Sequence, residues 1–280
     1  MDDLMSMELE DQKKELEVDL LLETIYRLAG YDFREYVRAS IMRRIENRRT
    51  IENVPTITAL IEKAIYEPGF LNRMIEGFSV PVTEMFRDSS FFKEFRKNVI
   101  PHLREIEEIR IWHAGCATGE EVLSMAILLE EEGLIDKTTI YATDMSEEAL
   151  NTAKSGVVSL WKMQDYTRNY LAAGGGKEFS EYYKTNAQFV SFSQHLLKNV
   201  IFAQHNLVTD QSFNEFHVIF CRNVLIYFNP TLQNKVHELF LQSLSRGGFL
   251  GLGNKESLRI SQYADAYEDF SVSEPLYRKK

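Results

Sequence analysis

The feature of this sequence that most limits its fold is a strand–helix alternation that starts at residue 109. The apolar run Ile109–Ala114 leads into the glycine-bearing segment Gly115–Gly119, and an amphipathic helical pattern then extends to Gly133. Short apolar runs that are each followed by a helical stretch are typical of parallel strands covered by helices. The sequence therefore predicts an α/β fold with a doubly wound sheet and helices on both faces. Further strands are expected at 138–142, 200–204, 218–221 and 249–253, and further helices at 146–156 and 229–247.

The first quarter of the chain has a different pattern. Apolar residues recur at helical spacing from Leu16 to Leu28, and two more helical stretches follow, at Phe33–Arg49 and after Pro55. No strand-like alternation interrupts them, so we expect an all-helical domain at 1–77 and a second domain at 78–280. Residues 157–199 break the rhythm of the second domain with glycines and aromatic residues, which indicates a small inserted β element.

Composition excludes several classes of protein. The 280 residues are 44% hydrophobic, which is enough to build a core and argues against disorder. The net charge of -10 disfavours nucleic acid as a partner. No apolar run approaches the roughly 20 residues that span a bilayer, and the acidic N-terminus does not resemble a signal peptide. Two cysteines without a CxxC pair predict neither a disulfide scaffold nor a zinc site. We expect a cytoplasmic protein with no metal and no membrane insertion.

Polar residues follow four of the expected strands. The turn that begins at Gly115 lets the backbone approach a ligand, although its spacing is not a dinucleotide fingerprint and a plain tight turn explains it equally well. Glu121 lies in the first turn of the next helix and, with its neighbouring glutamate, disfavours a phosphate there. Asp144 ends the following strand, where Rossmann-like proteins place an acid on ribose hydroxyls. Asn206 and Asn223 follow two later strands, and each of them alone fits a loop residue that only satisfies backbone groups.

Five motifs point to one family. The chain contains TEMFRD at 83–88, ATGEE at 117–121, ATD at 142–144, HNL at 205–207 and CRNVLIYF at 221–228. With these motifs it resembles the chemotaxis-receptor glutamate methyltransferases, the CheR family, over nearly its whole length. The resemblance implies a class I (Rossmann-like) methyltransferase sheet behind an N-terminal helical domain, with a small β-subdomain inserted at about 157–199. It also implies S-adenosyl-L-methionine as cofactor and S-adenosyl-L-homocysteine as product.

The resemblance assigns roles to individual residues. Thr83 and Arg87 would line the pocket for cofactor and acceptor, and Asp144 would hold the ribose. Arg87 and Tyr227 are the implied catalytic residues. The other implied cofactor contacts are Gly115, Glu121, Asn206, Leu207, Asn223 and Val224. One departure is Pro81, which stands where the family usually has asparagine and offers neither an amide side chain nor a backbone donor.

The chemistry of the implied reaction suits these residues. A glutamate side chain has a pKa of about 4.3, so the acceptor is already an anion at neutral pH and needs no general base. The enzyme must supply alignment and a dry site. A guanidinium can hold a carboxylate through two hydrogen bonds, which is the role expected of Arg87, with a surface salt bridge as its alternative. Tyr227 would orient the acceptor, or it would only pack as a half-buried ring.

Arginines gather between residues 27 and 49. The resemblance implies that this patch meets the acidic methylation region of a receptor. Apolar residues such as Ile41 and Ile45 share the same helical arc, so some arginines would instead cover a buried seam. The arginines expected at the receptor are Arg34, Arg38, Arg44 and Arg48.

Three other functions stay open at this point. A regulatory module would bind S-adenosylmethionine or its product without turnover, and Pro81 is the only hint of it. A methyltransferase could act on a non-receptor acceptor. A nicotinamide oxidoreductase would need a phosphate-binding G-x-G-x-x-G, which the turn at Gly115 lacks.

Overall fold

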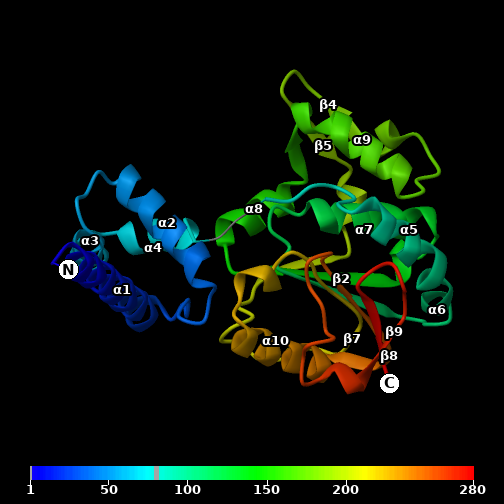
Figure 1. Cartoon of the computed structure of the whole chain (residues 1–280). Coiled ribbons are helices and arrows are strands. Elements are labelled where there is room, and N and C mark those ends of the chain that lie inside the picture. Colours follow the sequence, from blue (N-terminus) through cyan, green and yellow to red (C-terminus); the bar gives the residue numbers. More distant parts are fainter. Residues whose placement is uncertain (1, 79–81) are drawn as a thin grey trace. The chain divides into compact units, whose positions relative to one another are not determined.

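The computed structural model describes residues 2–78 and 82–280, and these divide into two compact units (Figure 1). The first unit, Met1–Val80 with Ile226–Leu232, is called the helical unit below. The second, Pro81–Leu225 with Gln233–Lys280, is called the sheet unit. The domain limits expected from the sequence, 1–77 and 78–280, stay a prediction. No helix within the described residues is both long enough and apolar enough to cross a membrane.

The helical unit consists of α1 (Asp2–Ala29), α2 (Arg38–Ile51), α3 (Ile57–Tyr66) and α4 (Phe70–Glu76). Three of these helices were expected. The fourth begins after Gly69, whose φ of 77° turns the chain out of α3 and into α4. The segment 226–232 joins this unit through the backbone, because the Val37 amide donates to the Tyr227 carbonyl at 2.8 Å.

The sheet of the second unit has seven strands in the order β6-β2-β1-β7-β8-β10-β9. Neighbouring strands run parallel from β6 to β8, whereas β10 is antiparallel to both of its neighbours. The order winds outward from β1 in both directions, which makes the carboxyl ends of β1 and β7 the switch point where such sheets bind ligands. The five expected strands are present, and β9 and β10 are additional. The bounds are β1 (Ile109–Ala114), β2 (Thr138–Asp144), β6 (Val200–Gln204), β7 (Phe216–Cys221), β8 (Leu244–Leu252), β9 (Tyr267–Asp269) and β10 (Leu276–Lys279).

Helices cover both faces of this sheet (Figure 1). Successive residues of β1 point to opposite faces. Ile111 packs into the core that α5 and α7 share, whereas the ring of Trp112 packs against that of Phe240 in α10, with 5.6 Å between the ring centroids. The doubly wound α/β sheet predicted from the sequence is confirmed. The helices on the Ile111 side are α5 (Ser89–Asn98), α6 (Ile100–Arg104), α7 (Glu120–Glu131) and α8 (Glu147–Ser155), and α10 (Pro230–Ser243) lies on the other.

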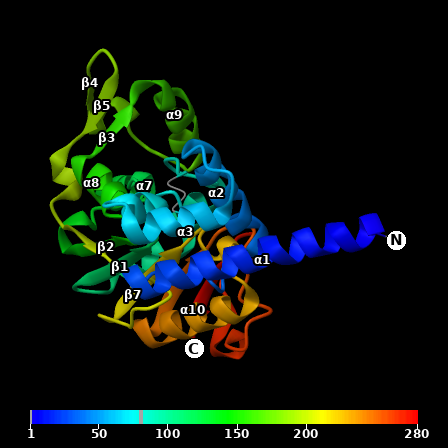
Figure 2. The ribbon, with the colours of Figure 1, turned by 90° about the vertical axis from the view of Figure 1, so that its left-hand side faces the viewer.

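The inserted element is a three-stranded antiparallel sheet with a helix (Figure 2). Its strands are β3 (Val157–Ser159), β5 (Phe189–Phe192) and β4 (Tyr183–Thr185), in that order, and its helix is α9 (Met163–Ala172). The sequence predicted the β element but not the helix. Two tyrosines anchor the insert to the ends of α7, since Tyr166 donates to Glu120 and Tyr182 donates to Glu131, each at 3.1 Å.

One boundary differs from its prediction. The pair Gly247-Gly248 was expected to end the last helix, but α10 ends at Ser243 and β8 begins at once. A side chain on Gly248 would lie 3.0 Å from the carbonyl oxygen of His217, next to a shift in the β7–β8 register. The two glycines therefore serve a β-bulge rather than a helix stop.

Candidate active site

Two loops meet at the switch point of the sheet. Gly115 follows β1 with a φ of 81°, and Val224 lies in the loop after β7. A side chain on Gly115 would come within 2.6 Å of Val224 Cγ2. Only glycine combines this backbone conformation with this close approach. The structure thus brings two predicted cofactor residues, Gly115 and Val224, close together. Because Gly115 has no side chain, none of its own covers the backbone of its loop.

Asp144 ends β2 and holds the same loop. Its Oδ2 accepts a hydrogen bond from the Ala117 amide and its Oδ1 accepts one from the Ser146 amide, both at 2.9 Å. Burial raises the pKa of Asp144, and the backbone hydrogen bonds act against that rise. Ser146 caps α8, since its Oγ accepts from the Ala149 amide at 3.2 Å, and Asp144 holds the amide of this cap residue. Each carboxylate oxygen keeps capacity for a further donor such as a hydroxyl.

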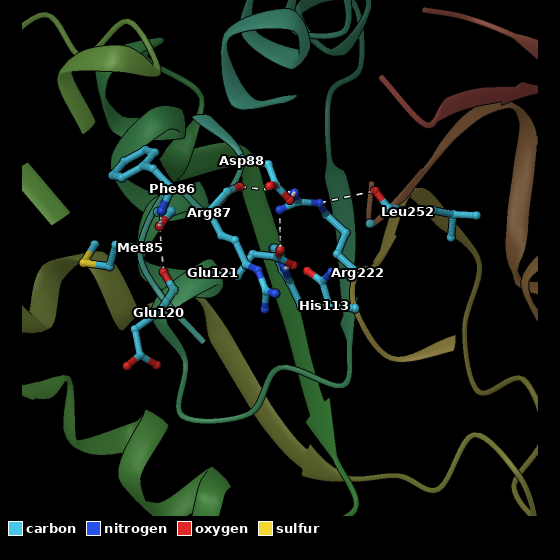
Figure 3. Close-up of polar contacts among 12 residues, drawn as sticks. Met85, Phe86, Arg87, Asp88, His113, Glu120, Glu121, Arg222 and Leu252 are labelled. Carbon is cyan, nitrogen blue, oxygen red and sulfur yellow. Dashed lines mark hydrogen bonds and ion pairs between the residues drawn. The ribbon is translucent and has the colours of Figure 1, made fainter. Parts of the chain in front are cut away.

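Glu121 lies in the first turn of α7, between a histidine and an arginine (Figure 3). Its Oε1 lies 2.9 Å from His113 Nδ1, and its Oε2 accepts from Arg222 at 2.9 Å. Burial raises the pKa of Glu121, but the hydrogen bond to His113 and the charge of Arg222 outweigh it and lower the pKa overall. Glu121 is therefore an anion, so Nδ1 of His113 carries the proton that faces it.

Arg222 belongs to the motif at 221–228, but the sequence analysis assigned it no role of its own. Its side chain is only 1% exposed, and Nη2 donates to Asp88 Oδ2 at 2.8 Å and to the Arg87 carbonyl at 3.1 Å (Figure 3). Its guanidinium also lies 4.3 Å from the centre of the Phe91 ring. The sequence feature that could have pointed to this role is the position of a charged residue directly after a buried strand, inside the motif at 221–228.

Arg87 lies on a turn with unusual backbone geometry. The residues on either side of it, Phe86 and Asp88, have φ of 50° and 54°, which is rare for residues other than glycine. The turn is held in place where the Phe86 amide donates to Ser124 Oγ at 2.8 Å. The Arg87 side chain is half-buried, and within residues 2–78 and 82–280 its guanidinium has no hydrogen-bond or ion-pair partner. A positively charged group is thus left available to a ligand.

Backbone strain gathers in these loops. Ala117 and Asn223 also have positive φ, at 48° and 61°. Of the five such residues other than glycine in the described part of the chain, four lie in the loops 85–88, 115–119 and 222–224. Strain of this kind persists only where the surrounding structure imposes it, and it clusters at functional sites. Asn223 is held by Glu256, another residue that the sequence analysis missed, whose Oε2 accepts from the Asn223 amide at 2.9 Å.

The predicted cofactor residues Asn206, Leu207 and Thr83 have no unusual backbone conformation. The side chain of Asn206 accepts a hydrogen bond from the Val208 amide at 3.0 Å, which is the loop-stabilising role left open by the sequence. Leu207 is buried next to it, and Thr83 is half-buried at the start of the segment that leads to the Arg87 turn. Pro81 lies outside the described residues.

Tyr227, the second predicted catalytic residue, belongs by its packing to the helical unit. The guanidinium of Arg44 lies 5.0 Å from the centre of its ring. Burial lowers the pKa of Arg44, and the neighbouring tyrosines oppose that shift. Arg87 and Tyr227 thus lie on different units.

The arginines expected at a receptor are engaged within the helical unit. Arg38 forms ion pairs with Glu15 and Asp19, and Arg44 is buried. Arg43, by contrast, is exposed and has no ion-pair partner in the described chain. The remaining contacts are Arg34 with Asp32 and Glu23, Arg44 with the Phe78 carbonyl, and Arg48 with Glu52 and the Arg73 carbonyl.

The donor set suits a ligand that carries hydroxyl groups and a positive charge. The acids Asp144 and Glu121 flank a backbone cradle at Gly115, which favours hydroxyls and a cation over a phosphate. Residues 81–272 match the family described as CheR methyltransferase, SAM binding domain, and residues 16–79 match the CheR methyltransferase all-alpha domain. Fold and site together define an S-adenosylmethionine-dependent methyltransferase. The chain belongs to the CheR methyltransferase family.

Individual relatives agree with this assignment. The protein Cher3 of Pseudomonas putida is 44% identical, over 96% of this chain and 98% of that protein. A chemotaxis protein methyltransferase of Listeria monocytogenes is 27% identical, over 87% of this chain and 92% of that protein. A 104.1 kDa protein of Rhodobacter capsulatus is 30% identical over 91% of this chain, which spans only 26% of that longer protein.

Proposed function

We propose that this protein transfers the methyl group of S-adenosylmethionine to glutamate side chains of a chemoreceptor-type signalling protein in the cytoplasm. The observation that carries the proposal is the guanidinium of Arg87, which has no hydrogen-bond or ion-pair partner among the described residues and is held on a strained turn of the sheet unit. The products are a glutamate methyl ester and S-adenosylhomocysteine. Chemotaxis methyltransferases among the relatives support a receptor as the source of the acceptor.

The cofactor, when bound, supplies an electrophilic methyl group on a positively charged sulfur. We assign Asp144 to the ribose, and Gly115, Glu121, Asn206, Leu207, Asn223, Val224 and Thr83 to the remaining cofactor contacts. Asp144 suits its role because it ends β2, and Glu121 suits its role because it lies in the first turn of α7, directly after the loop that follows β1.

Arg87 has the task of holding the acceptor. An acceptor carboxylate held by Arg87 would attack the methyl group as the carbon–sulfur bond breaks, so a cation and an anion would give neutral products and no proton would need to move. Two hydrogen bonds from a guanidinium fix the carboxylate in plane and aim one oxygen at the methyl group. Orientation of this kind can supply roughly 7–11 kcal/mol of the barrier. Tyr227 is the second residue proposed to orient the acceptor.

The test uses methyl-labelled S-adenosylmethionine and receptor-containing membranes from the same organism. We expect label that alkali releases as methanol, which identifies a carboxyl ester. Arg87→Ala should lose this label by about a hundredfold or more, because a charged contact to the reacting group is removed. Arg43→Ala, which removes one exposed positive charge from the helical unit, is the comparison, and its loss of label should stay within about threefold. Binding of S-adenosylhomocysteine without alkali-labile label would refute the proposal and favour another acceptor or a regulatory module.

A further inference from the structure

We propose that Arg222 is a positioning residue that ties the turn carrying Arg87 to Glu121, so that the acceptor-holding and cofactor-holding parts of the site form one mechanical unit. The proposal rests on the proposed function for the roles of Arg87 and Glu121. It assigns to Arg222 no contact with the acceptor or the cofactor, because its side chain is only 1% exposed.

The contacts of Arg222 occupy its guanidinium on every side. Nη1 donates to Glu121, Nη2 donates both to Asp88 and to the carbonyl of Arg87, and Nε donates to the carbonyl of Leu252 at 3.4 Å. The planar fork of an arginine can serve two carboxylates at once, whereas a lysine offers one compact charge. Two anions with half-buried side chains meet one cation here, so the ion pairs are less screened by solvent than pairs on the surface.

The turn at 85–88 needs an external support. Two of its residues, Phe86 and Asp88, have left-handed backbone conformations that a free peptide would leave. Ser124 holds one end of the turn through the Phe86 amide, and Asn169 of the insert donates to the Met85 carbonyl at 3.0 Å. Arg222 holds the other end, at the Arg87 carbonyl and the Asp88 carboxylate, which is the end that sets the direction of the Arg87 side chain (Figure 3).

The same guanidinium also fixes Glu121 from the side opposite His113. Any movement of Glu121 on cofactor binding therefore acts on Arg222 and, through it, on the Arg87 turn. One side chain, Arg222, thus couples two anionic partners from separate segments, Glu121 and Asp88. Substitution of either partner should break the coupling.

The experiment compares Arg222→Lys, Asp88→Asn and the double variant in the full chain. For Arg222→Lys we expect kcat to fall about 100-fold, because a small misplacement of Arg87 is costly, and affinity for S-adenosylhomocysteine to fall about tenfold. Asp88→Asn should lower kcat but change that affinity by less than about twofold, because it cuts only the Arg87 arm. The double variant should be no slower than Arg222→Lys, since residues that act as one unit are not additive.

The control is Arg96→Lys, which alters another arginine that bridges two carboxylates of the sheet unit, Glu131 and Glu132. It should lower the melting temperature while leaving kcat and affinity within about twofold. If Arg222→Lys behaves like this control, or if the double variant multiplies the two single losses in kcat, the inference is wrong.

A second measurement separates this inference from the proposed function. Hydrogen exchange of the amides at 85–88 is recorded with and without S-adenosylhomocysteine, and it requires no acceptor. We expect the ligand to slow exchange in the parent protein and in Arg96→Lys but not in Arg222→Lys. Equal slowing in all three proteins would overturn the inference even if methyl transfer to receptors is found. Loss of the slowing in Arg222→Lys alone would support it even if no receptor is methylated.

Discussion

Arginines of the helical unit and arginines of the sheet unit do different work. In the helical unit, Arg38 lies near the surface with two carboxylates whose side chains are 55% and 69% exposed. In the sheet unit, Arg222 is buried and holds two carboxylates of separate segments. Exposed ion pairs contribute little because solvent competes for both charges, whereas a buried one is costly to break. A dense run of arginines in the sequence therefore says less about function than one arginine placed after a buried strand.

The largest expected effect compares these two residues directly. Arg222→Met should lower the free energy of unfolding by about 3 kcal/mol, because it leaves Asp88 and Glu121 without their shared cation. Arg38→Met should cost less than about 1 kcal/mol, because water solvates its former partners. Urea titration of both variants gives the two values. Equal losses would show that burial does not separate the two classes of arginine.

The next largest effect is the pH dependence of stability, which should differ between the two units because only one of them contains a buried histidine with a lowered pKa. Residues 1–80 contain no histidine, whereas His237 of α10 is 2% exposed and burial lowers its pKa to about 4. The unfolded chain binds a proton near pH 6.5 that the folded chain refuses, so stability is full above pH 6.5 and is lost as the pH falls from there toward 4. We expect the sheet unit to lose about 2 kcal/mol between pH 7.5 and pH 5 from this group.

The helical unit should change little over that range. A hydrogen bond from Lys14 lowers the pKa of Glu46, so its stabilising effect is lost only below the ordinary range of a glutamate, near pH 4.5. Hydrogen exchange resolved by segment measures both units in one experiment, and His237→Leu should flatten the response of the sheet unit. A response unchanged by that substitution would assign the pH dependence to another group.

Two glycines with the same backbone conformation extend the comparison. Gly30 of the helical unit has a φ of 77° with open space around its Cβ position, whereas Gly115 has a φ of 81° and a Cβ added to it would lie 2.6 Å from Val224 Cγ2. Gly30→Ala should cost about 1 kcal/mol from backbone strain alone. Gly115→Ala should cost about 2 kcal/mol and should weaken binding of S-adenosylhomocysteine at least tenfold. Thermal unfolding and calorimetric titration test this, and equal behaviour of both variants would remove Gly115 from the proposed cradle.

The sequence predicted the parts of the fold that depend on local pattern. The five expected strands and the helices α7, α8 and α10 follow from apolar spacing, whereas α5 and α6 were not predicted. The α/β class, the family and the cofactor are confirmed. The edge strand β9 and its neighbour β10 were missed because runs of three and four residues with mixed polarity carry no periodic signal. The bulge at Gly247-Gly248 was mistaken for a helix stop because a glycine pair indicates both.

A site residue could be predicted from the sequence only where its role depends on its own position and not on partners that are distant along the chain. Asp144 and Gly115 were found because one ends a strand and the other directly follows one, and their cofactor roles stay predictions. Arg222 was given no role because its function depends on Asp88, which is 134 residues away in sequence. The ion pairs of the basic patch were unpredictable for the same reason, since the carboxylate that pairs with Arg38 lies 23 residues before it and cannot be inferred from the composition of residues 27–49. The role of the patch at a receptor stays a prediction.

The smallest expected effect concerns how the helical unit would meet a receptor. Arg43→Ala should lower kcat/KM for receptor methylation about threefold and weaken its salt dependence, because an exposed unpaired charge accelerates encounter with an acidic surface. Arg38→Ala should change kcat/KM less, because its charge is already compensated by Glu15 and Asp19. Affinity for S-adenosylhomocysteine should stay constant in both variants. If Arg38→Ala has the larger effect, its ion pairs must open on docking, and the set Arg34, Arg38, Arg44 and Arg48 expected from the sequence is the receptor surface after all.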